Sequence, residues 1–176
     1  MSALDKTPDN INYLSPLGYH FFVKKLPNVN FFVQHVQLPS VTLPAAQHHV
    51  TPLVHIHQAG DHLQYSELNI QFKLDENMEN YMELYDWMQG LGFPIDSAQY
   101  KTLLEKNQHI GDGLKSDISV IMLTNLKNAN IEYTFIDAWP TFLGNFALRT
   151  TDTDVKYIDC QAAFKFTYFT VKKIPK

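Results

Sequence analysis

The sequence has little of what several large classes of protein require. Of its 176 residues only Cys160 is a cysteine, so neither an internal disulfide framework nor a cysteine-based zinc site is expected. Only Arg149 is an arginine, and 14 bases face 18 acids, which argues against a dedicated nucleic-acid binder. The polar residues 1–10 are no signal peptide, and no apolar run approaches the ~18 residues of a membrane helix. We therefore expect a soluble protein from a reducing compartment.

What the chain has in quantity is aromatic side chains, which make up 13% of the sequence. Aromatic and β-branched residues in alternating runs favour sheets over a helical bundle. The predicted strands are 19–25 paired with 30–37, 54–58, 68–74, 117–124 paired with 131–138, and 157–171. The fold class that follows is α+β and mainly antiparallel β: a small β-sandwich or partly open barrel with one flanking helix. Residues 14–173 are expected to form one domain, between a flexible arm (1–13) and a short tail (174–176).

Turn-forming residues punctuate these runs. A turn at Leu26 to Val29 predicts that the first two strands form a hairpin that is apolar on both faces. Three prolines between residues 38 and 52 indicate a loop or an edge, because proline cannot donate to a strand ladder. A turn is predicted at 59–62, and Trp139 with Pro140 is predicted to end a strand.

The best predicted helix covers residues 77–89, with Asn77 or Asp75 as its cap and Gly90 just past its end. Its apolar arc is wider than one core contact requires, so we expect either a deeply buried helix or one wedged between its own sheet and a neighbouring subunit. Residues 92–114 are expected to be a long loop with one short helix near 98–106.

Histidines are the first candidates for chemistry. His55 and His57 share a strand face, and His62 follows closely, so a metal site on these three side chains is one hypothesis. No recognised second pair of ligands accompanies them, and surface or interface histidine is the preferred interpretation. Cys160 is interpreted as a small buried thiol. The motifs of hydrolases, zinc proteases and phosphate-binding loops are absent, so no catalytic set, cofactor or enzymatic activity is predicted.

Acidic residues gather on the predicted helix, because no base occurs between Lys73 and Lys101. Glu79 and Glu83 lie on one stripe of that helix. This stripe is either a solvated face or a docking site for a basic surface such as Lys172 and Lys173 of a neighbour. The candidates for a subunit interface are therefore aromatic residues of the first hairpin together with these charged residues: Phe21, Phe22, Phe31, Phe32, Glu79, Glu83, Lys172 and Lys173.

Several short motifs follow one another in a recognisable order. Leu38 and Pro39 follow the first hairpin, and Ala59, Gly60 and Asp61 precede a strand. Asp86 and Trp87 lie on the helix, and Trp139 and Pro140 precede the last strands. In this order the chain resembles, over residues 14–173, the tail-tube proteins of contractile-tailed bacteriophages.

The resemblance implies a structural protein of the virion tail, assembled in the host cytoplasm. Six copies would form a ring whose strands join across subunits, and rings would stack into a tube inside a sheath. DNA would pass through the lumen without being gripped, and the partners would be other copies, the sheath, and baseplate or neck proteins.

Some segments fit the repeated tube subunit less well: the first hairpin, the loop with His48 and His49, and residues 92–114. A tube-related paralogue, either a tail-completion (terminator) protein or a baseplate tube initiator, is therefore the alternative. A more distant hypothesis from another class is a small-ligand-binding β-barrel whose pocket is lined by Trp87 and Trp139.

Overall fold

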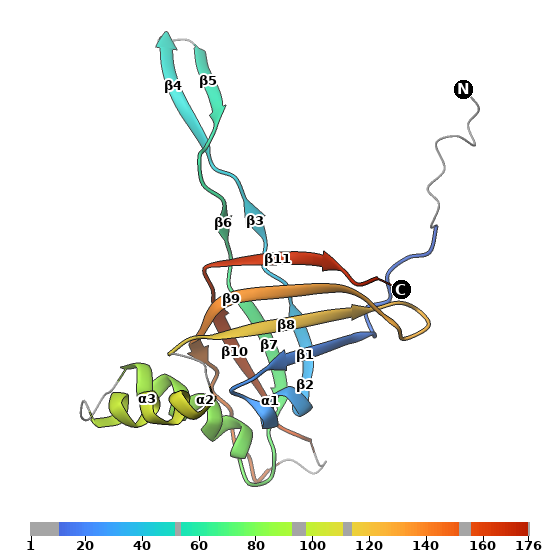
Figure 1. The fold of residues 1–176 in the computed structure, drawn as a ribbon, viewed down its shortest axis with the longest axis vertical. Helices are drawn as coiled ribbons and strands as arrows, with labels where there is room; N and C mark the ends of the chain where they lie inside the picture. Colours follow the sequence, from blue (N-terminus) through green and yellow to red (C-terminus); the bar gives the residue numbers. More distant parts are fainter. Residues whose placement is uncertain (1–10, 52–53, 93–97, 111–113, 152–155, 176) are drawn as a thin grey trace.

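Two antiparallel sheets packed face to face form the body of the molecule, and a long two-stranded arm leaves it (Figure 1). The computed structural model describes residues 11–51, 54–92, 98–110, 114–151 and 156–175. The strands are β1 (Tyr19–Val23), β2 (Val33–Gln37), β3 (Val41–Thr42), β4 (Ala45–Thr51), β5 (Val54–Ala59), β6 (Gln64–Tyr65), β7 (Leu68–Lys73), β8 (Ser116–Leu123), β9 (Ala129–Leu143), β10 (Asp159–Lys165) and β11 (Tyr168–Lys173). The helices are α1 (Pro27–Phe32), α2 (Glu79–Gly92) and α3 (Ala98–Ile110). The prediction of a mainly antiparallel β fold is confirmed, although three helices accompany the described strands rather than one.

Strand β9 belongs to both sheets. Its first part pairs with β8 and β11, and its last part, beyond Ala138, pairs with β10. Between the two parts Asp137 has a left-handed backbone (φ 56°), and its N–H donates to the Asp117 carboxylate at 3.0 Å. The bend divides the main sheet into a first sheet, β1-β8-β9-β11, and a second sheet, β9-β10-β7-β2. Our prediction that Trp139 and Pro140 end this strand is wrong, because β9 continues to Leu143 with Pro140 opposite Phe164.

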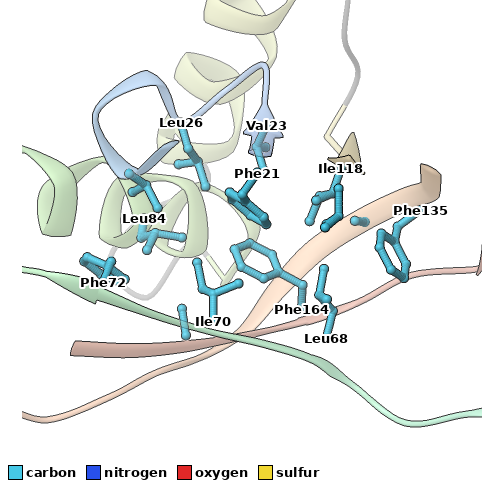
Figure 2. Close-up of a cluster of buried hydrophobic side chains, with 14 of the residues drawn as sticks. Phe21, Val23, Leu26, Leu68, Ile70, Phe72, Leu84, Ile118, Phe135 and Phe164 are labelled. Carbon is cyan, nitrogen blue, oxygen red and sulfur yellow. The ribbon is translucent and has the colours of Figure 1, made fainter. Parts of the chain in front are cut away.

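The core lies between the two sheets. Phe21, Ile118 and Phe135 come from the first sheet, and Ile70 and Phe164 come from the second; all five are buried. Figure 2 shows side chains of β1, β7 and β10 pointing toward one another across this layer. Period-2 patterns place these residues inward, which is why strands β7 and β8 were predictable from sequence.

The predicted first hairpin is wrong. Residues 27–32 form the short helix α1, so β1 pairs with β8 and β2 pairs with β7 instead of with each other. Pro27 occupies the first turn of α1, where its missing N–H costs nothing. The Asn30 side chain then bonds both backbone groups of Val23, each at 2.8 Å, and so takes the place of a partner strand.

The helix pair α2 and α3 lies at one side of the sheets (Figure 1). The Asp75 carboxylate accepts the N–H groups of Asn77 and Glu79, which caps α2 as expected for Asp75. Helix α2 continues through Gly90, which is buried, so the predicted end at this residue is wrong. The short helix expected near 98–106 is confirmed as α3, which is longer than expected and extends to Ile110.

Only one face of α2 is buried, and it carries Asn80, Leu84, Trp87 and Gly90. Met82 lies exposed on the same helix, as does Tyr85. The prediction of deep burial within the chain is therefore wrong, and a neighbouring subunit on the open face stays a prediction.

The proline-rich segment forms an arm rather than a loop. Strand β3 pairs with β6, and farther out β4 pairs with β5, so the chain runs out and back along one ribbon (Figure 1). The predicted strand 54–58 is confirmed as β5, whereas 59–62 is a bend within the returning ribbon rather than a reversal.

The expected closing strand is divided in two. β10 ends at Lys165 in the second sheet, and β11 starts at Tyr168 in the first, so this segment crosses between the sheets. Residues 146–149, between β9 and β10, form a loop.

Trp87 links the helix pair to the core. Its ring is 3% exposed and lies 6.3 Å from the Phe164 ring, and its Nε1–H donates to the Leu114 carbonyl at 2.9 Å. We expect Trp87→Ala to lower the free energy of unfolding by about 3–5 kcal/mol, since it leaves a large cavity. Urea denaturation measures this, with Tyr85→Ala on the exposed face of α2 as the matched control. An equal effect of both substitutions would contradict the packing described here.

Candidate assembly surfaces

Both sheets have open backbone edges within the part of the chain that the structure describes. In the first sheet, β1 pairs with β8 alone and β11 with β9 alone. In the second sheet, β2 pairs with β7 alone, and residues 139–143 of β9 pair with β10 alone. Strand edges present unpaired N–H and C=O groups in a row, which makes them templates for pairing with another chain.

The stem of the arm, which is the ribbon formed by β3 and β6, has a close backbone contact at one end and an apolar stripe along one face. The Gly60 N–H donates to the Pro44 carbonyl at 2.7 Å, and a Cβ on Gly60 would lie 2.4 Å from that oxygen. Only glycine allows so close an approach, which gives the Ala-Gly-Asp motif a structural reason. On one face of the stem Val41, Leu43 and Leu63 are each about half exposed.

Tyr65 continues this stripe into the body of the molecule. Its ring contacts the Phe166 and Phe169 rings at centroid distances of 5.7 and 5.4 Å. The apolar stripe of the arm is therefore continuous with the aromatic packing beside β11.

Helices α1 and α2 are joined by a carboxylate. Glu83 of α2 accepts the N–H of Asn28 at 3.2 Å, the N–H of Val29 at 3.4 Å and the side-chain amide of Asn28 at 2.8 Å. These are the otherwise unsatisfied donors at the start of α1, so Glu83 caps a helix far away in sequence.

Burial raises the pKa of Glu83 above its ordinary value. The hydrogen bonds from Val29 and Asn28 oppose this effect, and the neighbouring charge of Glu79 adds to it. The protonated form of Glu83 is therefore relatively favoured in the folded chain.

The outward faces of both sheets are mixed in chemistry. On the second sheet the register places His35, Gln71 and Gln161 in one row, and the half-exposed Phe142 lies on the same face as Asn69, because both are opposite Ala163. On the first sheet the apolar Phe22, Ile121, Ile136 and Tyr168 share the outward face with polar residues, which are Ser119, Thr134, Thr170 and Glu132 opposite Lys172.

The predicted interface residues do not form one surface. Phe21 is buried in its own core, so it is not available to a neighbour. Phe22 and Phe31 are 55% and 82% exposed, while Phe32 packs half-buried against the core. Glu83 is engaged by α1, which separates it from the exposed Glu79.

Lys172 and Lys173 lie exposed at the end of β11. The docking of these lysines of one copy against Glu79 of another stays a prediction.

The residues of the short motifs that carry the family resemblance lie at places where the chain packs or changes direction. Leu38 and Pro39 lie half-buried where β2 leads into the arm, and Asp61 is exposed beside the Gly60 contact. Asp86 is exposed on α2. The half-buried Trp139 ring lies 4.8 Å from the Lys115 ammonium.

The histidine hypothesis receives no support from the described side chains. His35 and His62 are exposed, whereas the side chains of His55 and His57 fall outside the described part of the structure. Among the residues that are described, no group of three or more His, Cys, Asp or Glu side chains could hold a metal ion. Cys160 is fully buried, as predicted, and burial raises the pKa of its thiol.

Sequence reasoning missed the arm stripe and the open face of α2. The alternation of Val41 and Leu43 was a usable signal, but the surrounding prolines obscured it. No comparable signal in the sequence marks Asn30, because its hydrogen bonds to the backbone of Val23 form only in the folded chain.

A family model described as phage tail tube protein matches residues 6–172, which is nearly the whole chain. The chain belongs to the phage tail tube protein family. The resemblance noted in the sequence is thereby confirmed, and the chain is a structural component of the virion tail.

Three relatives of this tail tube family member are informative. It is 24% identical, over 161 residues and 86% of both chains, to the tail tube terminator protein of Enterobacteria phage T4. Its fold is similar to the tube terminating cap of the anti-feeding prophage (TM-score 0.63, 12% identity, 99% and 100% of the two chains). It is also similar to the sheath/tube terminator structure of the PVC extracellular contractile injection system (TM-score 0.62, 13% identity, 93% and 99%). None of the helices among the described residues is long and apolar enough to cross a membrane.

The Glu83 contact leads to a prediction with a definite pH dependence. Glu83→Ala leaves the N–H groups at the start of α1 without their acceptor, and we expect it to lower the free energy of unfolding by about 1 kcal/mol at pH 7. Glu83→Gln keeps an acceptor and removes the buried charge, so we expect it to be less destabilising. Thermal denaturation measures both, with Glu79→Ala as the exposed control.

Because the pKa of Glu83 is raised in the folded state, the folded chain holds more protons than the unfolded chain just above pH 4.5. The part of the stability that depends on protonation of Glu83 is thus fully present below that pH and is lost as the pH rises through the raised pKa, while the hydrogen bonds that the carboxylate accepts from Asn28 and Val29 still contribute at pH 7. Relative to Glu83→Gln, the unaltered chain should lose stability over this window. A constant difference between the two proteins from pH 4 to 7 would contradict the assignment.

Proposed function

We propose that this chain is the terminator of a contractile tail tube, a homo-hexameric ring that caps the tube and lets DNA pass. The observation that carries this proposal is the identity with the tail tube terminator protein of phage T4, which extends over most of both chains. A shared fold does not separate a tube subunit from a cap. The terminator therefore stands as the preferred role, ahead of the repeated tube subunit and of a baseplate initiator.

The open edges support assembly into a closed ring. Four strand edges in two sheets would be an aggregation hazard for an isolated molecule, and a ring pairs every such edge with a neighbour. In a cyclic ring the contacts are head-to-tail. Each copy therefore pairs one edge with the neighbour on one side and a different edge with the neighbour on the other side.

The arm supplies a second type of contact. Its apolar stripe would be covered by a neighbouring copy or by the tube ring below, which removes exposed Val41, Leu43 and Leu63 from water. The sheath is a further proposed partner, since the PVC relative is a sheath/tube terminator. The proposed role has no catalytic step.

The ligand-binding alternative is less well supported. The Trp87 indole is buried against Phe164 and hydrogen-bonded to Leu114, so it is not available to line a pocket.

Copy number tests the proposed role directly. A terminator is present as one ring per tail, whereas a tube subunit is present in every stacked ring. Quantitative mass spectrometry of purified virions measures the ratio of this chain to the major tube subunit, and we expect one ring's worth. A ratio typical of many rings would overturn the terminator assignment, and negative-stain images of single particles without rings would overturn ring formation.

The arm stripe gives a mutational test of assembly. We expect Leu43→Ser with Leu63→Ser to leave the chain folded but to weaken association by about 2 kcal/mol, since two half-exposed leucines lose their burial in the contact. Analytical ultracentrifugation measures the oligomer, and circular dichroism checks the fold. Leu126→Ser, at a leucine 83% exposed outside the arm, is the control. Association that is unchanged by the double substitution would exclude the arm from the interface.

A further inference from the structure

Strand β1 turns only every second residue toward its free edge. The Leu123 N–H of β8 donates to the Gly18 carbonyl at 2.9 Å, and the register between β1 and β8 is regular. In an antiparallel pair both backbone groups of a residue point to the same side, and successive residues alternate. Even-numbered residues of β1 therefore bond β8, and the backbone groups of Tyr19, Phe21 and Val23 point to the free edge.

A side chain closes this edge at Val23. The Asn30 amide oxygen accepts the Val23 N–H, and the Asn30 amide nitrogen donates to the Val23 carbonyl, each at 2.8 Å. The same carbonyl accepts the Leu26 N–H at 3.2 Å, which occupies its second lone pair. Asn30 thus makes the bonds that a residue of another strand would make, and the open part of the β1 edge ends at Phe21.

Strand β11, at the opposite edge of the first sheet, shows the same alternation (Figure 1). The Ile174 N–H donates to the Asn130 carbonyl at 2.8 Å, in the regular register between β11 and β9. Even-numbered residues of β11 therefore bond β9, and the backbone groups of Phe169, Val171 and Lys173 point to the free edge.

The free edge of β11 begins at Phe169. Just before this residue the chain crosses from β10 in the second sheet, and the Thr167 N–H donates to the Ile136 carbonyl at 3.0 Å. This N–H is therefore not available to a neighbouring chain. An edge that begins at Phe169 matches an edge that ends at Phe21.

Side-chain directions also agree along the two edges. Phe21 is buried on the core side of β1, and the Phe169 ring lies 5.5 Å from the Phe135 ring on the core side of β11. Val171 follows Phe169 on the same side of the strand, yet its side chain is 51% exposed. A strand of another copy beside β11 would remove this apolar side chain from water.

The edges of the second sheet are less regular. The register shifts between Val33 and His35 where β2 pairs with β7, and between Ala163 and Phe164 where β10 pairs with β9. The pairings of β1 with β8 and of β11 with β9 contain no such shift. Bulges twist a strand edge and discourage its pairing with another chain, so the first sheet offers the better defined edges.

We infer that β11 of one copy adds to β1 of the next, and that the Asn30 amide stops the added strand at Phe21 and so fixes its register. This inference rests on the proposed ring. Phe21 then lies opposite Phe169 of the neighbouring copy, and Tyr19 lies opposite its Val171. An aromatic pair and a pair of an aromatic with a β-branched residue both stabilise a sheet.

The direction of the strands is suitable for this contact. Neighbouring strands in the series β1, β8, β9 and β11 are antiparallel, so β1 and β11 of one copy run in opposite directions. Copies related by rotation about the ring axis point the same way along it. The added β11 is therefore antiparallel to β1.

Asn30 acts against one competing arrangement. A slip by two residues leaves every side chain on its own face of the sheet, so the pattern of the side chains does not exclude it. In the slipped register Phe169 of the neighbouring copy would lie opposite Val23, which gives a longer pairing. The Asn30 amide already occupies the position that the Phe169 backbone would need.

Disulfide cross-linking between copies measures the register. In the inferred register His20 and Thr170 form a directly opposed pair outside the hydrogen-bonded positions, with Cα atoms about 4.5 Å apart. Within one copy β8 and β9 lie between β1 and β11, which separates these two strands by about 14 Å, so only a neighbour can complete the bond. His20→Cys with Thr170→Cys tests the inferred register, and His20→Cys with Lys172→Cys tests the slipped register.

We expect mild oxidation of the first pair to give covalent oligomers up to the hexamer on a non-reducing gel, and oxidation of the slipped pair to give mainly monomer. The unaltered chain, whose Cys160 is fully buried, shows the background. Equal or stronger cross-linking of the slipped pair would overturn the register. Rings seen by negative-stain microscopy in which neither pair cross-links would overturn the contact of β1 with β11 and leave the proposed function intact. An absence of rings from the unaltered chain overturns both.

Removal of the amide tests the role of Asn30. Asn30→Ala frees both backbone groups of Val23, so in the slipped-pair variant we expect it to increase cross-linking. Asn28→Ala is the matched control, because the Asn28 amide on the same helix bonds Glu83 instead of Val23. A purely structural role of Asn30 would lower the melting temperature without changing which pair reacts, and that result would overturn its role as a stop. Asn30→Asp, which keeps the acceptor and loses the donor, repeats the test if Asn30→Ala does not fold.

Discussion

The bend of β9 at Asp137 is the constraint on which the rest of the structure depends. One strand enters the first sheet, turns through a left-handed residue held by the Asp117 carboxylate, and continues in the second sheet. Two sheets that share a strand can enclose a core without closing into a barrel. The same bend therefore creates the buried cluster around Phe135 and Phe164 and leaves both sheets with strand edges that no other described strand pairs.

Free strand edges are templates for pairing with another chain, and the proposed ring would pair them with copies of the same chain. The arm carries half-exposed apolar residues away from the body, and Tyr65 anchors its stem to the aromatic packing of Phe166 and Phe169. Helix α1 occupies the end of the β1 edge, where Asn30 bonds Val23. The helices pack at one side of the sheets, where Glu83 ties α1 to α2 and Trp87 ties α2 to the core. Membership of the tail tube family gives this unfinished architecture a role, because a tail is built from repeated contacts between like folds.

Regular periodicity made a large part of the fold predictable. β7, β8, β9 and the centre of α2 follow from alternating or helical patterns, because one face of each meets a core and the other meets water. The errors occurred where a tertiary contact replaced a local one. Residues 27–32 are helical because Asn30 bonds Val23 and Glu83 caps Asn28 and Val29, and neither contact is visible as a local pattern. Among the candidate interface residues, Phe21 and Glu83 make their contacts inside the chain, whereas Phe22 and Phe31 are exposed and their place in an interface stays a prediction.

The sequence by itself determined the class of fold, the family, and the kind of chemistry that is missing. Composition limits what side chains can do, and the order of the short motifs carried the resemblance to the family. Only the tertiary structure decided which edges of the described strands stay open, which side chains face outward from each sheet, and where the arm begins. These properties depend on register and on the bend of β9, and both are settled by contacts between residues that lie far apart along the chain.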